Sequence, residues 1–308
     1  MSKARTAEFF YMESKKMYKF TLSSDSTCDL YLQEYEANDI KHASLTFMME
    51  KNGVIRECLD NFSEYSQYVD FYNELRSGTF SKTAMLNYEA HYEHFKKLAE
   101  EGAEDVLHFT ISSGLARTHE VAEQAAADVK KDFPKFNVFV ADPLSATCGQ
   151  GALVRIALDC RNKGMTAQET YELVMSLRLR IQHFVVADDL NYLKKGGRIS
   201  PAVAAIGSVL NVKPILSFNK EGKLEPIAKV RGVKKAIAFI KEKLEKEGPD
   251  PDYNYLFIVH TDNEPAAAEL AEYVRNRFHI EPHVQIMGPV IGSHVGPGAF
   301  ALGYISKS

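Results

Sequence analysis

Residues 105–163 alternate between short apolar strands and helical segments, and this alternation constrains the fold more than any other feature of the sequence. Residues 105–111 (DVLHFTI) and 137–141 (NVFVA) have the apolar character of buried strands. Each is followed by a segment with helical spacing, residues 119–132 and residues 145–163. Strands that alternate with helices of this length form a parallel sheet covered on both faces. The sequence therefore predicts an α/β fold.

Two domains are expected from the length of the chain and from a change in the pattern of predicted helices and strands near residue 166. The chain has 308 residues, and a domain typically takes about 150 residues. Residues 166–308 mix helices with a predicted hairpin, whose strands cover residues 214–218 and 224–229. We therefore predict an N-terminal parallel α/β domain (18–165) and a C-terminal mixed α+β domain (166–308), preceded by an extension at residues 1–17.

Composition and charge exclude several classes of protein. The chain is 45% hydrophobic and 25% charged, which are ordinary globular values and exclude a disordered or coiled-coil chain. The formal net charge of −4 gives no sign of the clustered basic surface that nucleic acids require. The four cysteines form no CxxC pair, and neither an HExxH motif nor a cluster of Asp and His occurs. We therefore expect free thiols, no metal and no nucleic-acid partner.

The apolar stretches are too short or too polar for membrane segments. The most apolar stretch, residues 201–216, is interrupted by Ser208, Asn211 and Lys213. A membrane-spanning helix needs about 20 nearly uncharged apolar residues. Residues 1–17 lack the apolar core of a signal peptide. We therefore expect a cytoplasmic protein without stable membrane insertion.

Small and hydroxylated residues end several predicted strands, where open α/β sheets bind their ligands. The segment TISSGL at 110–115 places two serines where free N–H groups and hydroxyls suit an anion. The segment GSHVGPG at 292–298 surrounds His294 with glycines, which let a backbone approach a ligand closely. Serine caps and single histidines are also common structural features. Both segments are candidates for ligand binding.

Two further classes of function remain open from the residues alone. A hydrolase or transferase could use Ser112 or Ser113 with His294 and Asp142, although the G-x-S-x-G motif is absent. A phosphate- or nucleotide-binding module could use the starts of the helices, although neither G-x-x-x-x-G-K-[ST] nor G-x-G-x-x-G occurs.

The order and the amino-acid sequences of five segments resemble those of a known family. They are residues 20–30 (FTLSSDSTCDL), 110–115 (TISSGL), 188–200 (DDLNYLKKGGRIS), 210–224 (LNVKPILSFNKEGKL) with KVRG at 229–232, and 292–305 (GSHVGPGAFALGYI). The chain thereby resembles the DegV family of bacterial fatty-acid-binding proteins. The resemblance covers nearly all of the chain after residue 17, and YLKKGGRIS together with HVGPGA is its most specific part.

The resemblance implies a function without catalysis. Two α/β domains would enclose one long-chain fatty acid, such as palmitate, as the only ligand, with no further cofactor. The protein would present the carboxylate of this fatty acid to a fatty acid kinase, which forms the acyl phosphate.

The resemblance also implies a set of site residues. Its carboxylate ligands would be Thr83, Ser112 or Ser113, and His294. Arg198 would lie on the surface that faces the kinase. The acyl chain would contact the apolar helix that contains Ala202, Ile206 and Leu210.

The sequence departs from the family pattern beside the expected head-group site. Residues 83–86 read TAML where the family often reads TSQP, and residues 115–118 read LART where it often reads LSGT. Two interpretations of Arg117 follow: a positive charge near the carboxylate, or a side chain that points to solvent.

Overall fold

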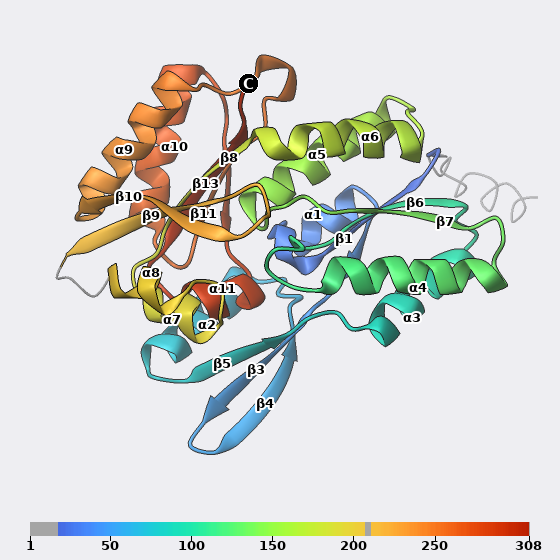
Figure 1. Cartoon of the computed structure of the whole chain (residues 1–308), viewed down its shortest axis with the longest axis horizontal. Helices are drawn as coiled ribbons and strands as arrows, with labels where there is room; N and C mark the ends of the chain where they lie inside the picture. Colours follow the sequence, from blue (N-terminus) through green and yellow to red (C-terminus); the bar gives the residue numbers. More distant parts are fainter. Residues whose placement is uncertain (1–17, 207–210, 308) are drawn as a thin grey trace, which may run out of the picture.

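The computed structural model describes residues 18–206 and 211–307, and Figure 1 shows it as two sheets on either side of a central helix. The expected extension at residues 1–17 lies outside the described residues. In the described part no helix is long and apolar enough to cross a membrane.

The first sheet, sheet A, has four parallel strands in the order β2-β1-β6-β7. Its strands are β1 (Thr21–Asp25), β2 (Ile40–Ala43), β6 (Asp105–Phe109) and β7 (Asn137–Ala141). Its helices are α1 (Leu32–Ala37), α3 (Tyr88–Glu100), α4 (Thr118–Asp132), α5 (Cys148–Asn162) and α6 (Ala167–Leu177), with a short 3-10 turn, η1 (Ser26–Cys28), after β1. α3 and α4 lie on one face and α5 and α6 on the other (Figure 1), which confirms the predicted covered parallel sheet.

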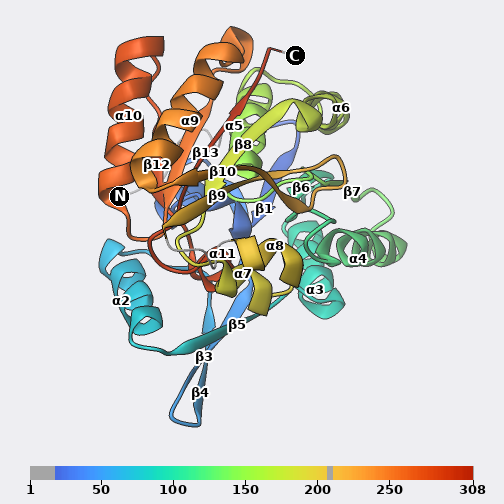
Figure 2. The ribbon, with the colours of Figure 1, turned by 60° about the vertical axis from the view of Figure 1, so that its left-hand side comes forward.

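A small antiparallel sheet, sheet B, is inserted between β2 and α3 and was not expected from the sequence. It has the order β4-β3-β5, with β3 (Thr46–Lys51), β4 (Val54–Leu59) and β5 (Phe80–Ala84), and α2 (Tyr65–Arg76) precedes β5. The β3–β4 hairpin projects from the rest of the molecule in both views (Figures 1 and 2). The chain leaves sheet A at Ala43 and enters sheet B at Thr46.

The third sheet, sheet C, is mixed and has the order β10-β9-β8-β13-β11-β12. Its strands are β8 (Ile181–Val186), β9 (Val212–Phe218), β10 (Leu224–Arg231), β11 (Leu256–His260), β12 (His283–Ile286) and β13 (Phe300–Ile305). β9 and β10 form the predicted hairpin, and only β11 and β12 run parallel among these strands. α9 (Val233–Lys246) and α10 (Glu264–Phe278) cover one face.

Helix α5 packs against both large sheets, because it contacts β1 of sheet A as well as β8, β11 and β13 of sheet C. Nearly all of its residues are buried. Gly151 permits the close approach, since a Cβ there would lie 3.0 Å from the carbonyl oxygen of Cys28 and 3.2 Å from Phe257. One apolar core therefore runs through α5 from one sheet to the other.

Short helices fill the space below this core, between sheet B and sheet C. They are α7 (Leu190–Lys195), α8 (Pro201–Ile206) and α11 (Pro289–Val295). Two further 3-10 turns lie elsewhere in the chain: η2 (Arg178–Arg180) before β8 and η3 (Pro251–Tyr253) before β11. α11 contacts α7, α2, β3 and β5. It therefore links the end of sheet C to sheet B.

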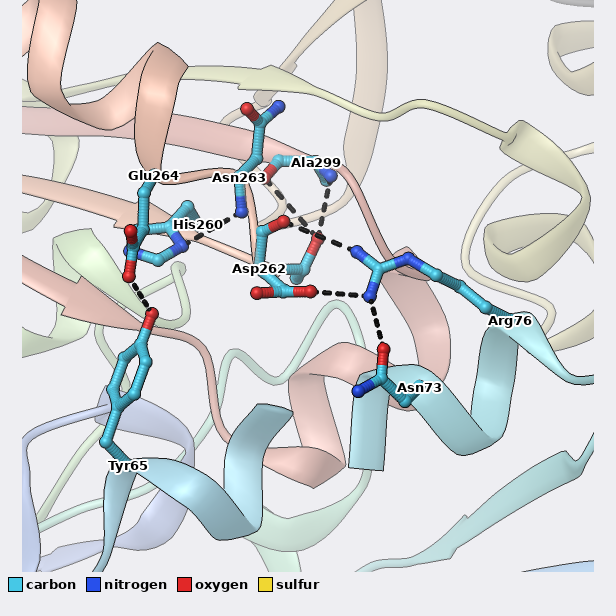
Figure 3. Close-up of polar contacts among 9 residues, drawn as sticks. Tyr65, Asn73, Arg76, His260, Asp262, Asn263, Glu264 and Ala299 are labelled. Carbon is cyan, nitrogen blue, oxygen red and sulfur yellow. Dashed lines mark hydrogen bonds and ion pairs between the residues drawn. The ribbon is translucent and has the colours of Figure 1, made fainter. Parts of the chain in front are cut away.

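Polar contacts also hold α2 against the corner between β11 and α10 (Figure 3). Arg76 pairs with Asp262 at 2.5 Å, and its guanidinium also bonds the carbonyl oxygen of Asp262. The hydroxyl of Tyr65 donates to the carboxylate of Glu264. Sheet B and its helix are thus anchored to sheet C at the side of the molecule as well as through α11.

Candidate ligand-binding site

An apolar cavity lies where sheets A, B and C meet. Its volume is about 760 Å³, including the part that opens to solvent. Most of its lining side chains are apolar, among them Leu45, Ile111, Leu115, Phe218 and Ile291. The cavity is thus suited to an apolar ligand.

A second, more polar cavity of about 1150 Å³ adjoins the first. Lys82, Asp189, Asn191, Lys195 and Ser293 are among its lining residues. Three side chains line both cavities: Thr83, Arg198 and His294. These three residues, which we call the junction, therefore mark the place where the apolar space meets the polar one.

Two adjacent hydrogen bonds between β5 and α11 build the junction. The Oγ1 atom of Thr83 lies 2.7 Å from Nε2 of His294, and the hydroxyls of Ser81 and Ser293 lie 2.6 Å apart. Ser81 and Thr83 share one face of β5, because side chains alternate along a strand. The structure therefore brings two of the expected carboxylate ligands, Thr83 and His294, together.

His294 belongs to a helix and not to the loop that its flanking glycines suggested. It lies in the last turn of α11, which ends at Gly296 with φ 76°. A Cβ on Gly196 would lie 2.1 Å from Nδ1 of His294, so only glycine fits beside the imidazole. The helix and this glycine fix the position of the ring.

The imidazole of His294 is neutral near pH 7. Burial, followed by the charge of Arg198, lowers its pKa to about 3. Its Nδ1 atom is buried and has no hydrogen-bond partner among the described residues. A buried polar atom of this kind is normally paired, so a ligand or a water molecule is expected to satisfy it.

Arg198 is half-buried, although the sequence led us to expect an exposed side chain. Its guanidinium donates to the carbonyl oxygen of Gly196, and burial lowers its pKa. The guanidinium remains charged, because arginine has a pKa above about 12 in water. Arg198 therefore supplies a positive charge to the junction, and its contact with a kinase stays a prediction.

The two candidate serines lie apart from the junction. The Ser112 hydroxyl is fully buried and donates to the carbonyl oxygen of Gly222 at 2.8 Å. Ser113 is exposed, and its N–H donates to Asp142 at 3.2 Å. Neither serine bonds His294, so the Ser–His–Asp arrangement of the hydrolase alternative is not assembled. Ligation of a carboxylate by Ser112 or Ser113 stays a prediction.

The other expected residues have different outcomes. Ala202 is exposed and does not line the apolar cavity. Leu210 and the side chain of Ile206 lie outside the described residues. Arg117 is exposed and forms an ion pair with Glu120, which supports the solvent-facing interpretation. The role of the α8 segment in holding an acyl chain stays a prediction.

Sequence reasoning missed the basic side chains of the polar cavity, Lys82 and Lys195. The signal was present for Lys82, because it lies between Ser81 and Thr83 in a segment already under consideration. The position of Lys82 beside the polar cavity could be assigned only after the structure showed this segment to be strand β5. The described residues contain no group of three or more His, Cys, Asp or Glu side chains that could hold a metal ion.

The fold and the two cavities define a three-sheet α/β protein that can enclose an amphiphilic small molecule. A family described as "Uncharacterised protein, DegV family" matches residues 19–307. The chain therefore belongs to the DegV family, as the resemblance predicted.

Relatives of known activity or structure extend this assignment. A "Fatty acid-binding protein" of Thermotoga maritima is 31% identical over 290 residues, which cover 92% of this chain and 97% of the relative. The crystal structure of a DegV lipid-binding protein from Thermotoga maritima has a TM-score of 0.78 and 29% identity, and it covers 94% of this chain and 99% of its own. The Fatty Acid Kinase (Fak) B3 protein of Streptococcus pneumoniae, loaded with linoleic acid, has a TM-score of 0.77 at 20% identity over 93% of this chain and 99% of its own, which shows a shared fold.

Proposed function

We propose that this protein binds one long-chain fatty acid in its apolar cavity and presents the carboxylate to a fatty acid kinase. The observation that carries the proposal is the junction of Thr83, Arg198 and His294, where an apolar cavity ends at a polar one. A fatty acid has the same division, with a long apolar tail and one polar end. The fatty-acid-binding relative supports this assignment.

The tail supplies most of the affinity in this proposal. Each buried CH₂ contributes about 0.8 kcal/mol, so about 15 carbons contribute roughly 12 kcal/mol before costs. Association and ordering cost about 4–15 kcal/mol. The polar groups need only orient the head, because the tail alone already offsets much of this cost.

The carboxylate would occupy the junction and face the polar cavity. The hydroxyl of Thr83 and the unpartnered Nδ1 of His294 can bond it, and Arg198 supplies a positive charge. Lys82 and Lys195 extend the positive charge into the polar cavity. Such an opening gives an external enzyme access to the head group while the tail stays buried.

The protein acts as a binding subunit and leaves the chemistry to its partner. Its fold is that of the Fak B3 protein, whose name couples a fatty-acid-loaded protein to a fatty acid kinase. An acyl phosphate forms when the carboxylate attacks a nucleotide phosphate in line, which requires a fixed carboxylate. The junction would provide that fixed position.

Mass spectrometry of the purified protein tests the proposal. Native and denaturing spectra are expected to show a co-purified long-chain fatty acid without any addition. Oleate added to delipidated protein is expected to restore the complex. A bare polypeptide that also fails to bind added oleate would contradict the proposal, and esterase turnover lost in Ser113→Ala would favour the hydrolase alternative.

A further inference from the structure

Two buried aspartates meet at the start of α11, outside the cavities described above. Asp29 follows η1, and Asp60 follows β4; their exposed fractions are 4% and 6%. A Cβ on Gly288, the residue before α11, would lie 2.8 Å from Oδ1 of Asp60 and 3.1 Å from Oδ1 of Asp29. Both carboxyl groups therefore converge on the same backbone position.

The carboxyl groups hold the first turn of α11. The N–H of Gly288 donates to Oδ1 of Asp29 at 2.8 Å, and the N–H of Val290 bonds Asp60. The hydroxyl of Tyr72 donates to the carbonyl oxygen of Met287 at 2.6 Å. The start of α11 is thus fixed by side chains from the N-terminal half of the chain.

One oxygen of each carboxyl group has no partner. The Oδ2 atoms of Asp29 and Asp60 are buried and accept no hydrogen bond among the described residues. Both aspartates line a small pocket beside α11. Two negative charges in such a place repel each other, and burial adds a desolvation cost.

The surroundings supply no opposite charge. The other titratable groups that face the pair are the carboxylate of Asp25, the thiol of Cys148 and the side chains of His42, Tyr31, Tyr68 and Tyr72. Burial lowers the pKa of His42 to about 4, so this side chain is neutral near pH 7. No lysine or arginine lines the pocket in the described part of the chain.

We propose that Asp29 and Asp60 share one proton at neutral pH and are positioning residues for His294. The proposal rests on the proposed function, because it concerns the residue that would hold the fatty-acid head. α11 is one short helix, so a change at Gly288 is transmitted to His294 in its last turn. A second negative charge would disturb the docking of α11 and thereby the junction.

The ionisation of the pair agrees with this geometry. Burial, with the charge of Asp60 adding to it, raises the pKa of Asp29 well above its usual value. Burial raises the pKa of Asp60 to about 7, and the charge of Asp25 adds to it. The two groups titrate as one coupled pair, so the proton belongs to the pair and to neither residue alone.

The test measures fatty-acid affinity against pH in three proteins: the wild type, Asp60→Asn and Asp29→Asn. The probe is cis-parinaric acid, a fluorescent fatty acid, between about pH 6 and pH 8.5. The wild-type affinity is expected to fall at least about threefold more across this range than that of either variant. Asparagine cannot ionise but keeps an oxygen that can accept the Gly288 N–H. His294 does not titrate in this range, because its pKa is about 3.

A second measurement separates a positioning role from a purely structural one. It is made on the protein without added fatty acid. A ¹³C NMR titration of the aspartate carboxyl carbons is expected to show a coupled pair near pH 7 that both variants abolish. Asp70→Asn, at an exposed position of α2, is the matched control and is expected to behave as wild type in both measurements.

The outcomes distinguish the two proposals. Wild-type protein that binds the probe with the same pH dependence as both variants overturns the positioning role and leaves the proposed function intact. Protein that binds no probe at any pH overturns the proposed function, and the NMR titration still decides whether the pair shares a proton. Asp29→Asn provides the result if Asp60→Asn does not fold.

Discussion

At the scale of single residues, the junction combines one neutral ring, one hydroxyl and one charge. His294 and Thr83 bond each other, and Arg198 lies beside them. The two neutral groups can orient a carboxylate, and the half-buried Arg198 adds one positive charge. This arrangement suits a protein that must also release its ligand to a partner.

His294→Ala is expected to lower fatty-acid affinity about ten- to hundredfold without abolishing binding. Each hydrogen bond to a charged group contributes about 1.5–3 kcal/mol, whereas the tail contributes several times more. Isothermal titration calorimetry with oleate measures the change, and Thr83→Val is expected to act in the same direction. An unchanged affinity in both variants would show that the carboxylate binds elsewhere.

Arg198→Ala is expected to slow phosphorylation by a fatty acid kinase more than it lowers the amount of bound fatty acid. The guanidinium lines the polar cavity, from which the partner would reach the carboxylate. The measurement compares lipid content by mass spectrometry with acyl-phosphate formation. An equal loss of both quantities would show that Arg198 serves the structure of the junction alone.

At the scale of secondary-structure elements, the junction depends on how closely α7 and α11 approach each other. Gly196 follows α7 and faces the ring of His294. Its φ of −71° is open to any residue, so space alone restricts this position. The contact between two short helices therefore sets the geometry of the head-group site.

Gly196→Ala is expected to displace His294 and to weaken oleate binding about tenfold or more, because the new Cβ would lie 2.1 Å from Nδ1. Gly248→Ala is the matched control, since its Cβ would meet no atom closer than 3.6 Å. Calorimetric titration with oleate measures both variants. Equal affinity in the two variants would contradict the proposed approach of α7 and α11.

The contact of α3 with sheet A buries several histidines. The rings of His91 and His108 lie 5.4 Å apart, and those of His94 and His108 lie 5.6 Å apart. Burial, followed by the charges of neighbouring side chains, lowers the pKa of His91 and His94 to about 4 and that of His108 well below its usual value. The folded protein therefore excludes protons that the unfolded chain binds.

His91→Phe is expected to make the protein less sensitive to acid. The stabilisation that neutral histidines allow is complete above the unfolded pKa of about 6.5 and is lost as the pH falls toward 4. Phenylalanine keeps the stacking on Phe95 but cannot ionise. Urea unfolding between these pH values measures the change, with exposed His279→Gln as control. A wild-type slope in His91→Phe would contradict the expectation.

Elements with regular hydrophobic spacing could be predicted from the sequence, and elements without it could not. β6, β7 and the hairpin of β9 and β10 were expected and are present. β4 was missed because it is exposed on both faces, so its sequence shows no alternation. The bond between Thr83 and His294 joins positions 211 residues apart, and the sequence pattern contains no information about such a contact.

At the scale of the whole molecule, the apolar cavity lies between the two halves of the chain. The cavity walls come from both halves of the chain, because the loops after β6 and β7, strand β5 of sheet B and strands β8 and β9 of sheet C all contribute lining residues. The division into domains at residues 18–165 and 166–308 stays a prediction, although the strands of sheet C all follow residue 166 and those of sheets A and B all precede it. A bound ligand would therefore strengthen the contact between the two halves.

Oleate is expected to raise the melting temperature of delipidated protein. A ligand that binds only the folded state adds about 2.7 kcal/mol of stability at 100 times its Kd. For a chain of this size, this corresponds to about 4 °C or more. Differential scanning fluorimetry over a range of oleate concentrations measures the shift. A constant melting temperature at saturation would contradict binding at the contact between the halves.

The position of β13 has a consequence for synthesis on the ribosome. This last strand lies in the middle of sheet C, between β8 and β11. Domains fold as units while the chain emerges, starting from the N-terminus. Sheet A can form early, but sheet C stays divided until residues 300–305 have been made. Until then the nascent chain exposes the unpaired strand edges of β8 and β11 that β13 later covers, and we expect chaperones to bind it at this stage.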